Sequence, residues 1–366
     1  MRSRTNLLFT LALAPLLLCV GCSKSVSPAT NTPAPRPATT PVSKLPQVEK
    51  PKPAPLTFTL PPEHVFGAEV KLGEFTVKAV NRYWAGPQTT TLTLEEAFEQ
   101  KLCTISETGI SNSVVADVRG KHPVLLLTGD MLIGGRQDRL VAHSMLLEPG
   151  TTIVPVFCAE ISRWTPEDGE YDETFKRDRQ SPQVDLNVKA AVYQQGTQAA
   201  VWSAISQVTA GLDSPDPHGT GSYRLAFDAP PVQVAIDKMF LRARKIVCAF
   251  TVGFAVYRDN EIVAADIFDS TQLLDHVADK LLRGYAMTAV YGDVTNWKIE
   301  LPEEPTKDET KTPEPRRVPH HAPGTYDPPP APLGEFQQDG TLRFECRRTP
   351  DVRPIHTGIF RGKPKP

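Results

Sequence analysis

The stretch IVCAFTVGFAVYRDNEIVAADIFDSTQLLDHVADKLLRGYAMTAVYG, residues 246–292, holds two strand patterns followed by one helix pattern. Residues 246–257 are apolar and β-branched, and Asp259 and Asn260 suit a two-residue turn into a partner strand at 261–268. Asp269 or Ser270 then caps a predicted helix over 271–291, which Gly292 ends. A hairpin followed directly by a long helix is not part of a regular βαβ alternation.

The preceding residues also predict strands with helices interspersed. Thr93 and Glu96 have the spacing of a capping box, so a short helix is expected to about residue 102. A longer helix is expected over 186–208, with Gly196 interrupting it. The predicted strands are 113–118, 123–128, 140–147 and 152–157. We therefore predict an α+β fold: one mixed, β-rich domain with interspersed helices, flanked by disordered Pro-rich segments.

The N-terminus has the layout of a secretory signal. Arg2 and Arg4 precede an apolar run of about fourteen residues, which is too short to span a bilayer comfortably. The run ends in Cys19-Val20-Gly21-Cys22, which resembles a bacterial lipobox with Cys19 in place of the usual Leu. We expect residues 1–21 to be removed and Cys22 to be lipidated, which would tether the chain to a membrane. Ordinary signal cleavage nearby and an uncleaved anchor are the alternatives.

The residue after Cys22 bears on location. Ser23 stands where Asp would be the usual signal for retention in the inner membrane. The expected location is therefore the cell envelope, with the outer membrane favoured in a cell that has one.

Proline divides the rest of the chain, which has 366 residues and 36 prolines. Residues 22–58 carry almost no large apolar side chains and cannot offset their ordering entropy, so we interpret them as a spacer. Residues 59–300 have ordinary globular composition and are predicted to form the α+β domain. Residues 301–366 are predicted to be a Pro-rich, charged tail, in which His320, His321 and His356 are solvated.

Charge and cysteine content narrow the function classes. The net charge is −2, so no global field draws nucleic acid, and we predict no nucleic-acid partner. Cys103, Cys158, Cys248 and Cys346 form no CxxC pair, which argues against a zinc ribbon or a thioredoxin-type site. Disulfides and buried free thiols both remain open for these four. No metal-ligand spacing stands out, and the sequence indicates no particular cofactor or protein partner.

The densest polar segment is GDMLIGGRQDR, residues 129–139, directly after a predicted buried strand. Its spaced glycines superficially resemble a phosphate loop, but the terminal Lys and Ser or Thr are missing, so we exclude a nucleoside triphosphatase. Gly134 and Gly135 let backbone amides approach an anion, and Arg136 and Arg139 can bind phosphate or carboxylate. The same arginines can equally pair with neighbouring carboxylates in a hairpin turn.

A second polar segment, CAEISRW, covers residues 158–164 at a strand end. A dyad of Cys158 with His143 is conceivable; a general-base role for Glu160 is favoured over it, and pairing of Glu160 with an arginine is favoured further. Asp266 lies in an otherwise apolar strand, where a carboxylate is usually paired, exposed or functional. No catalytic residue is assigned. The candidate ligand-binding residues are Asp130, Arg136, Gln137, Arg139, Glu160, Arg163 and Asp266.

These segments resemble a known prokaryotic family. Residues 129–139 are similar to the Gly-x-x-Leu-x-Gly-Ala-Lys-Gln-Asn-Arg pattern of the ADP-ribosylglycohydrolase- and rhodanese-phosphatase-superfamily-associated domain family. Residues 158–164 resemble its Cys-Val-Glu-x-x-Arg-Trp block, and AVW at 200–202, DIF at 266–268 and LLRGYA at 281–286 resemble later blocks in the same order. The resemblance implies genomic association with enzymes of ADP-ribose and phosphate chemistry, and no particular activity.

Two positions depart from the family pattern. Arg136 stands where Lys is usual, which argues against a Schiff-base or proton-transfer role because Arg is effectively always charged. Asp138 stands where Asn is usual and adds a carboxylate that can neutralise an anion site.

We predict an envelope lipoprotein whose domain recognises a ligand or partner, such as an anionic small molecule. The alternatives are an enzyme acting on a phosphate- or ribose-containing substrate and a structural envelope protein. Convergence of the candidate residues in an open cleft would favour binding or catalysis, and closed ion pairs would favour the structural alternative.

Overall fold

The computed structural model describes residues 58–84, 86, 89–161, 174–176, 183–212, 220–292, 335–337, 341–347 and 354–361. The chain divides into residues 1–53 and 54–366, and all of the described residues belong to the second unit. The expected signal, Cys22 and the spacer up to residue 57 therefore lie outside the described residues. No helix among the described residues combines the length and the apolar character needed to cross a bilayer.

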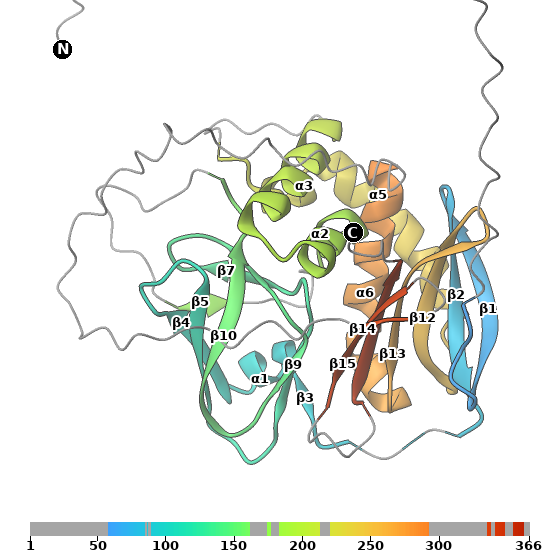
Figure 1. The fold of residues 1–366 in the computed structure, drawn as a ribbon, viewed down its shortest axis with the longest axis horizontal. Coiled ribbons are helices and arrows are strands. Elements are labelled where there is room, and N and C mark those ends of the chain that lie inside the picture. Colours follow the sequence, from blue (N-terminus) through green and yellow to red (C-terminus); the bar gives the residue numbers. More distant parts are fainter. Residues whose placement is uncertain are drawn as a thin grey trace, which may run out of the picture. The chain divides into compact units, whose positions relative to one another are not determined.

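The described strands form three sheets (Figure 1). The largest is antiparallel, in the order β1 (His64–Leu72), β2 (Phe75–Arg82), β12 (Thr251–Arg258), β13 (Glu261–Phe268), β16 (His356–Arg361), β15 (Thr341–Cys346) and β14 (Glu335–Phe336). The second has the order β11 (Phe175–Lys176), β7 (Met131–Gly134), β8 (Arg139–Val141), β10 (Gly150–Cys158), β5 (Ser113–Val118) and β4 (Cys103–Glu107). The third joins β3 (Leu92–Thr93), β6 (Val124–Leu126) and β9 (Met145–Leu147).

Helices are interspersed among these strands, so the predicted α+β class is confirmed. They are α1 (Leu94–Glu99), α2 (Leu186–Gln194), α3 (Gln198–Gly211), α4 (Tyr223–Asp228), α5 (Pro230–Ala243) and α6 (Thr271–Tyr291), with a short 3-10 helix at Arg244–Ile246. Helix α6 packs on β12 and β13, with α5 and α2 beside it (Figure 1). Apolar residues of the sheet and of α6, such as Phe254, Leu274 and Leu281, form the core between these layers.

The stretch from residue 246 to 292 folds largely as expected. Asp259 and Asn260 both have positive φ, 49° and 65°, as a type I′ hairpin turn requires. Strand β13 and helix α6 have the predicted bounds, and α6 ends at Gly292 with φ 80°. The preceding strand begins at Thr251 rather than at residue 246, because residues 244–246 form the 3-10 helix.

The local helix signals upstream are also confirmed. Thr93 and Glu96 form the capping box, although the helix ends at Glu99 rather than near residue 102. The expected helix over 186–208 is broken into α2 and α3 at Gly196, whose φ is 62°.

The single strand expected over residues 140–147 is wrong. Residues 139–141 pair with β10, whereas residues 145–147 pair with β6 in another sheet. Between them, the Ser144 amide donates to the Thr128 hydroxyl at 2.8 Å, and the Thr128 amide donates to the Ser144 hydroxyl at 3.0 Å. These two hydrogen bonds take the place of strand pairing and turn the chain from one sheet into the next.

The expectation of a tail after residue 300 is corrected for residues 335–337, 341–347 and 354–361. Strands β14, β15 and β16 extend the largest sheet, and β16 pairs with β13 from Ala264 to Phe268. The prediction that His356 is solvated is wrong, since its side chain is 1% exposed. Phe360 and Ile359 of β16 are buried in two different apolar clusters, and their burial stabilises the strand on the sheet.

A close backbone approach at Gly253 gives a test of the hairpin. A Cβ there would lie 2.3 Å from the Asp266 carbonyl oxygen and 2.9 Å from the Ile267 Cα. We expect Gly253→Ala to lower the free energy of unfolding by about 3 kcal/mol, because β13 must shift. Gly120→Ala is the control, since its nearest neighbours would be 3.7 Å away, and it should change stability by under about 0.5 kcal/mol. Equal urea midpoints for the two variants would contradict the close packing.

Candidate functional site

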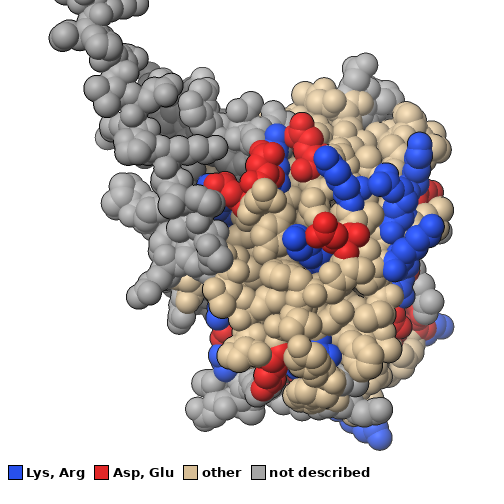
Figure 2. All heavy atoms as spheres, turned by 90° about the vertical axis from the view of Figure 1, so that its right-hand side faces the viewer, with Lys and Arg blue, Asp and Glu red and all other residues tan. Residues whose placement is uncertain are grey.

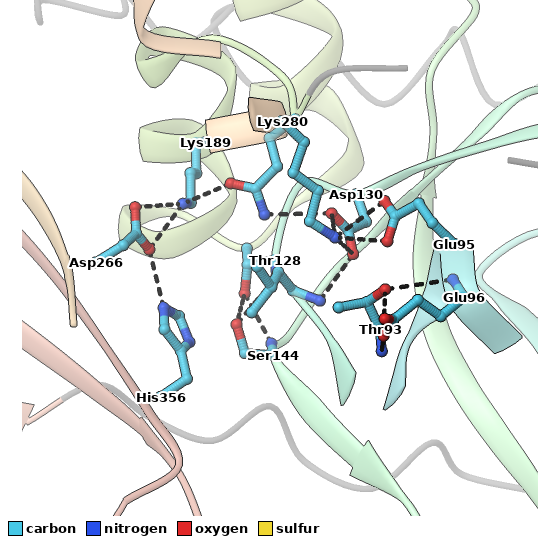
Figure 3. Close-up of polar contacts among 12 residues, drawn as sticks. Thr93, Glu95, Glu96, Thr128, Asp130, Ser144, Lys189, Asp266, Lys280 and His356 are labelled. Atoms are coloured by element: carbon cyan, nitrogen blue, oxygen red, sulfur yellow. Dashed lines mark hydrogen bonds and ion pairs between the residues drawn. The ribbon is translucent and has the colours of Figure 1, made fainter. Parts of the chain in front are cut away.

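Charged side chains of a folded protein normally stand in water, as Lys, Arg, Asp and Glu do on the face in Figure 2. A connected run of charged and polar side chains instead lies inside the protein (Figure 3). We call it the central ion chain. Its members are the partly buried Glu95 and the buried Lys280, Asp130, Gln183, Lys189, Asp266, His356 and Tyr285.

Lys280 is the centre of one half of this chain. Its Nζ lies 3.1 Å from the carboxylate of Asp130 and 3.1 Å from Oε1 of Glu95. The Asp130 carboxylate also accepts hydrogen bonds from the Leu127 amide at 2.9 Å and from Nε2 of Gln183 at 3.2 Å. One lysine is thus shared by two carboxylates, and backbone and amide donors supply the additional hydrogen bonds that a buried carboxylate needs.

Asp266 is the centre of the other half. Nζ of Lys189 lies 3.0 Å from both of its oxygens, the Tyr285 hydroxyl donates at 2.7 Å, and Nε2 of His356 lies at 2.9 Å. Burial alone would raise the pKa of Asp266, but Lys189 and the hydrogen bonds from His356 and Tyr285 hold it well below its usual value. Asp266 is therefore ionised.

Gln183 joins the two halves. Its Nε2 donates to Asp130, and its Oε1 accepts from Lys189 at 3.0 Å. The approach of this residue depends on Gly284 of α6, where a Cβ would lie 3.0 Å from the Gln183 carbonyl oxygen. Any larger residue at 284 would push the segment away from the helix that carries Lys280.

A second buried group, the Arg139 cluster, contains Arg139, Glu107, Gln137 and Cys158. Arg139 begins β8 and is fully buried. Its Nη1 donates to Oε1 of Gln137 at 3.3 Å and to the sulfur of Cys158, and its Nη2 reaches the two Glu107 oxygens at 3.4 and 3.5 Å. Burial raises the pKa of the Cys158 thiol, while the charge of Arg139 opposes that shift.

The glycine turn beside this cluster already holds carboxylates. Gly134 and Gly135 have φ of 117° and 58°, and the Gly134 amide donates to Oδ1 of Asp138 at 2.9 Å. The Arg136 amide donates to Oε1 of Glu107 at 2.9 Å. Oδ2 of Asp138 lies 3.1 Å from Nε of Arg224. The chain therefore supplies its own anions to the amides that the sequence pattern assigns to a ligand.

The predicted site residues fall into separate groups rather than one. Asp130 and Asp266 belong to the central ion chain, and Gln137 and Arg139 belong to the Arg139 cluster, with Arg136 joined to it through its amide. Glu160 is buried, and its carbonyl oxygen accepts from the Trp202 indole at 3.1 Å. Arg163 lies outside the described residues.

The structure also shows the state of the four cysteines and tests the dyad of Cys158 with His143. Cys103, Cys158, Cys248 and Cys346 are all free. The Cys158 thiol interacts with Arg139 and with the Ser111 carbonyl oxygen at 3.8 Å, and among the described residues no hydrogen bond joins it to His143. Burial lowers the pKa of His143 to about 4. Within the described part of the chain, no group of three or more His, Cys, Asp or Glu is arranged to hold a metal ion.

Sequence reasoning missed Lys189, Lys280, Glu107 and His356. A usable signal existed for the two lysines, because each lies among apolar residues on the buried face of a helix. Lys280 is three residues after Val277 and four before Gly284, both buried. A charged residue at such a position is seldom fully buried without a partner, so its place on the helix predicts a buried carboxylate beside it.

Removing the shared lysine should reveal how strongly the fold depends on it. Lys280→Met removes the ammonium group that lies 3.1 Å from both Asp130 and Glu95, and we expect a loss of about 3–5 kcal/mol in the free energy of unfolding. Lys78→Met is the matched control, because Lys78 pairs with Glu69 at 3.0 Å on the surface and should matter by under about 1 kcal/mol. Urea unfolding measures both, and comparable losses would show that the buried pair has no special weight.

Comparison with known proteins agrees with the family-like blocks at residues 129–139 and 158–164. No curated protein and no solved structure gives a significant match. Residues 63–317, well over half of the chain, match one family model. The chain belongs to the family of the ARG and Rhodanese-Phosphatase-superfamily-associated Protein domain.

Proposed function

We propose that the domain recognises an anionic ligand, a phosphate or a carboxylate, at the Arg139 cluster. The incomplete pairing of Arg139 carries this proposal. Its guanidinium is fully buried, its Nε has no hydrogen-bond partner within the described part of the chain, and its contacts to Glu107 are 3.4 Å or longer. A buried donor without a hydrogen-bond acceptor costs about 1–3 kcal/mol, so binding of a ligand that accepts from Arg139 would be favoured.

The contrast with the central ion chain supports the choice of cluster. There, Asp266 accepts from Lys189, Tyr285 and His356, and such closed ion pairs favour a structural role. In the Arg139 cluster, Glu107 occupies the position of an anion, since it contacts both the Arg136 amide and the Arg139 guanidinium. An external anion would reach Arg139 by taking the place of Glu107.

The family supports phosphate-bearing compounds as the first ligands to test. Its name associates it with phosphatase-superfamily proteins, and that association is an indication of chemistry rather than of activity. Bidentate binding by a guanidinium suits phosphate and carboxylate alike. Inorganic phosphate, sugar phosphates and ADP-ribose therefore form the screen, with succinate as the carboxylate.

Two substitutions separate ligand binding from bracing. Glu107→Gln removes the competing charge and should tighten anion binding by about tenfold, whereas Arg139→Gln should weaken it by about ten- to over a hundredfold. Calorimetric titration measures both, and thermal melting reports stability in parallel. If both variants melt much earlier and no anion in the screen shifts the wild-type melt, the cluster only braces the strands.

We further propose that the chain is an envelope lipoprotein anchored through Cys22, with the outer membrane favoured. The signal-like N-terminus and the lipobox-like residues 19–22 support this location. Several acyl chains on Cys22, at about 0.8 kcal/mol for each buried methylene, would give stable anchoring.

Fractionation of cells tests the anchor. Cys22→Ala should move the protein from the detergent-extracted membrane fraction to the soluble fraction. Cys19→Ala, which keeps the lipidation residue, should leave it in the membrane. Retention of the Cys22→Ala protein in the membrane fraction would refute lipid anchoring there.

A further inference from the structure

The C-terminal strands are held on the sheet by β16. Five residues of β16 pair with β13, from Thr357 opposite Ile267 to Phe360 opposite Ala264, with His356 opposite Phe268 at the end. Strand β15 pairs along β16, and β14 pairs with β15. The family-model match ends at residue 317, so all three strands lie beyond it. They are an addition to the matched region that covers the edge of β13.

His356 makes a buried polar link between this addition and the rest of the domain. Its Nε2 lies 2.9 Å from Oδ1 of Asp266, and its ring stacks on Phe268 with 4.8 Å between centroids. The other nitrogen, Nδ1, is buried and has no hydrogen-bond partner among the described residues. The arrangement fits a neutral ring whose Nε2–H donates to the ionised carboxylate.

We propose that His356 is an acid-sensitive latch: protonation of its ring weakens the docking of β14, β15 and β16 and uncovers the edge of β13. Protonation places a hydrogen on Nδ1, which then becomes a buried donor without an acceptor. Lys189 repels the new charge and Asp266 attracts it, but the cost of burying a charged ring exceeds this attraction, so protonation favours release of the ring to water.

The other groups around His356 do not make protonation of its ring favourable in the docked state. Burial lowers the pKa of His356, while hydrogen bonding to Asp266 opposes the shift. Burial raises the pKa of Cys346 to about 12 and also raises the pKa values of Tyr193 and Tyr285. None of these three groups therefore carries a negative charge near neutral pH. The charged groups that act on His356 are Asp266 on β13, Lys189 on α2 and Asp130 just before β7. Tyr193 on α2 and Tyr285 on α6 interact with the same Asp266 carboxylate, and Cys346 on β15 lies opposite His356 in the strand ladder.

The direction of the pH effect follows from this lowered pKa. The docked state binds fewer protons than the released state at any pH below the usual histidine value of about 6.5. Docking is therefore strongest above that pH and weakens as the pH falls. The population of the released state should rise by up to about tenfold for each pH unit between the two pKa values.

Release would have a structural consequence at β13. Its backbone groups from Ala264 to Phe268 would lose their ladder partners and form an open strand edge. Such an edge can accept another extended strand. This inference involves no residue of the Arg139 cluster and stands apart from the proposed anion site.

Hydrogen–deuterium exchange on the full chain tests the latch. Protection factors corrected for intrinsic exchange are compared at about pH 7 and about pH 5 in peptides from β15 and β16. We expect their protection to fall by about ten- to a hundredfold in acid while peptides from β2 and α6 keep theirs. Unchanged protection of β15 and β16, or an equal loss in all four elements, would overturn the proposal.

Two variants sharpen the result. His356→Gln keeps an amide that can donate to Asp266 but cannot be protonated, so the pH dependence of β15 and β16 should disappear. His143→Gln is the control, because burial also lowers the pKa of His143 but it lies between β8 and β9, far along the chain from these strands. Persistence of the pH dependence in His356→Gln would refute the latch, and the wild-type comparison remains decisive if that variant does not fold.

Discussion

Asp266 is a fully buried negative charge, and the packing around it keeps that charge paired. Its three side-chain partners come from three different elements: Lys189 from α2, Tyr285 from α6 and His356 from β16. Transfer of a carboxylate from water to the interior costs several kcal/mol, which only close and well-directed partners offset. Strand β16 must therefore pair with β13 in one register, because a slip of one residue would turn His356 to the other face of the sheet, and both helices must dock with Lys189 and Tyr285 facing Asp266.

Gln183 extends that constraint to the rest of the domain. Through it, the ion pair on the largest sheet is connected to the pair between Asp130 and Lys280, which lies beside β7 and α1. A buried network of this kind adds little net stability compared with apolar packing, but it penalises every arrangement that leaves one member unpaired. We interpret the central ion chain as the feature that selects how α6 and α2 sit between the sheets.

The elements that the sequence predicted well are those whose signals are local. The turn at Asp259 and Asn260, the capping box at Thr93 and the full length of α6 each depend on residues within a few positions of one another. The failures concern contacts between distant residues. Asp266 is unusual by its apolar neighbours alone, but Lys189 is 77 positions away and His356 is 90 positions away, and no periodicity connects them. Strands β14 to β16 lie in a proline-rich region, and that composition led to the prediction of a tail instead of strands.

At the candidate site, the sequence predicts the type of group that binds but not whether the chain itself supplies it. Glycines and arginines at residues 134–139 predict a place for an anion, and the structure fills that place with Glu107 and Asp138. Asp138 stands where the family pattern has Asn, and its carboxylate lies 3.1 Å from Arg224. An Asn there could accept from the Gly134 amide but could not neutralise Arg224. In this chain, the partly exposed Arg224 has a carboxylate at 3.1 Å, while the buried Arg139 reaches Glu107 only at 3.4 Å or more. Because water does not solvate the buried guanidinium, we propose Arg139 as the cation at which an external anion would gain most.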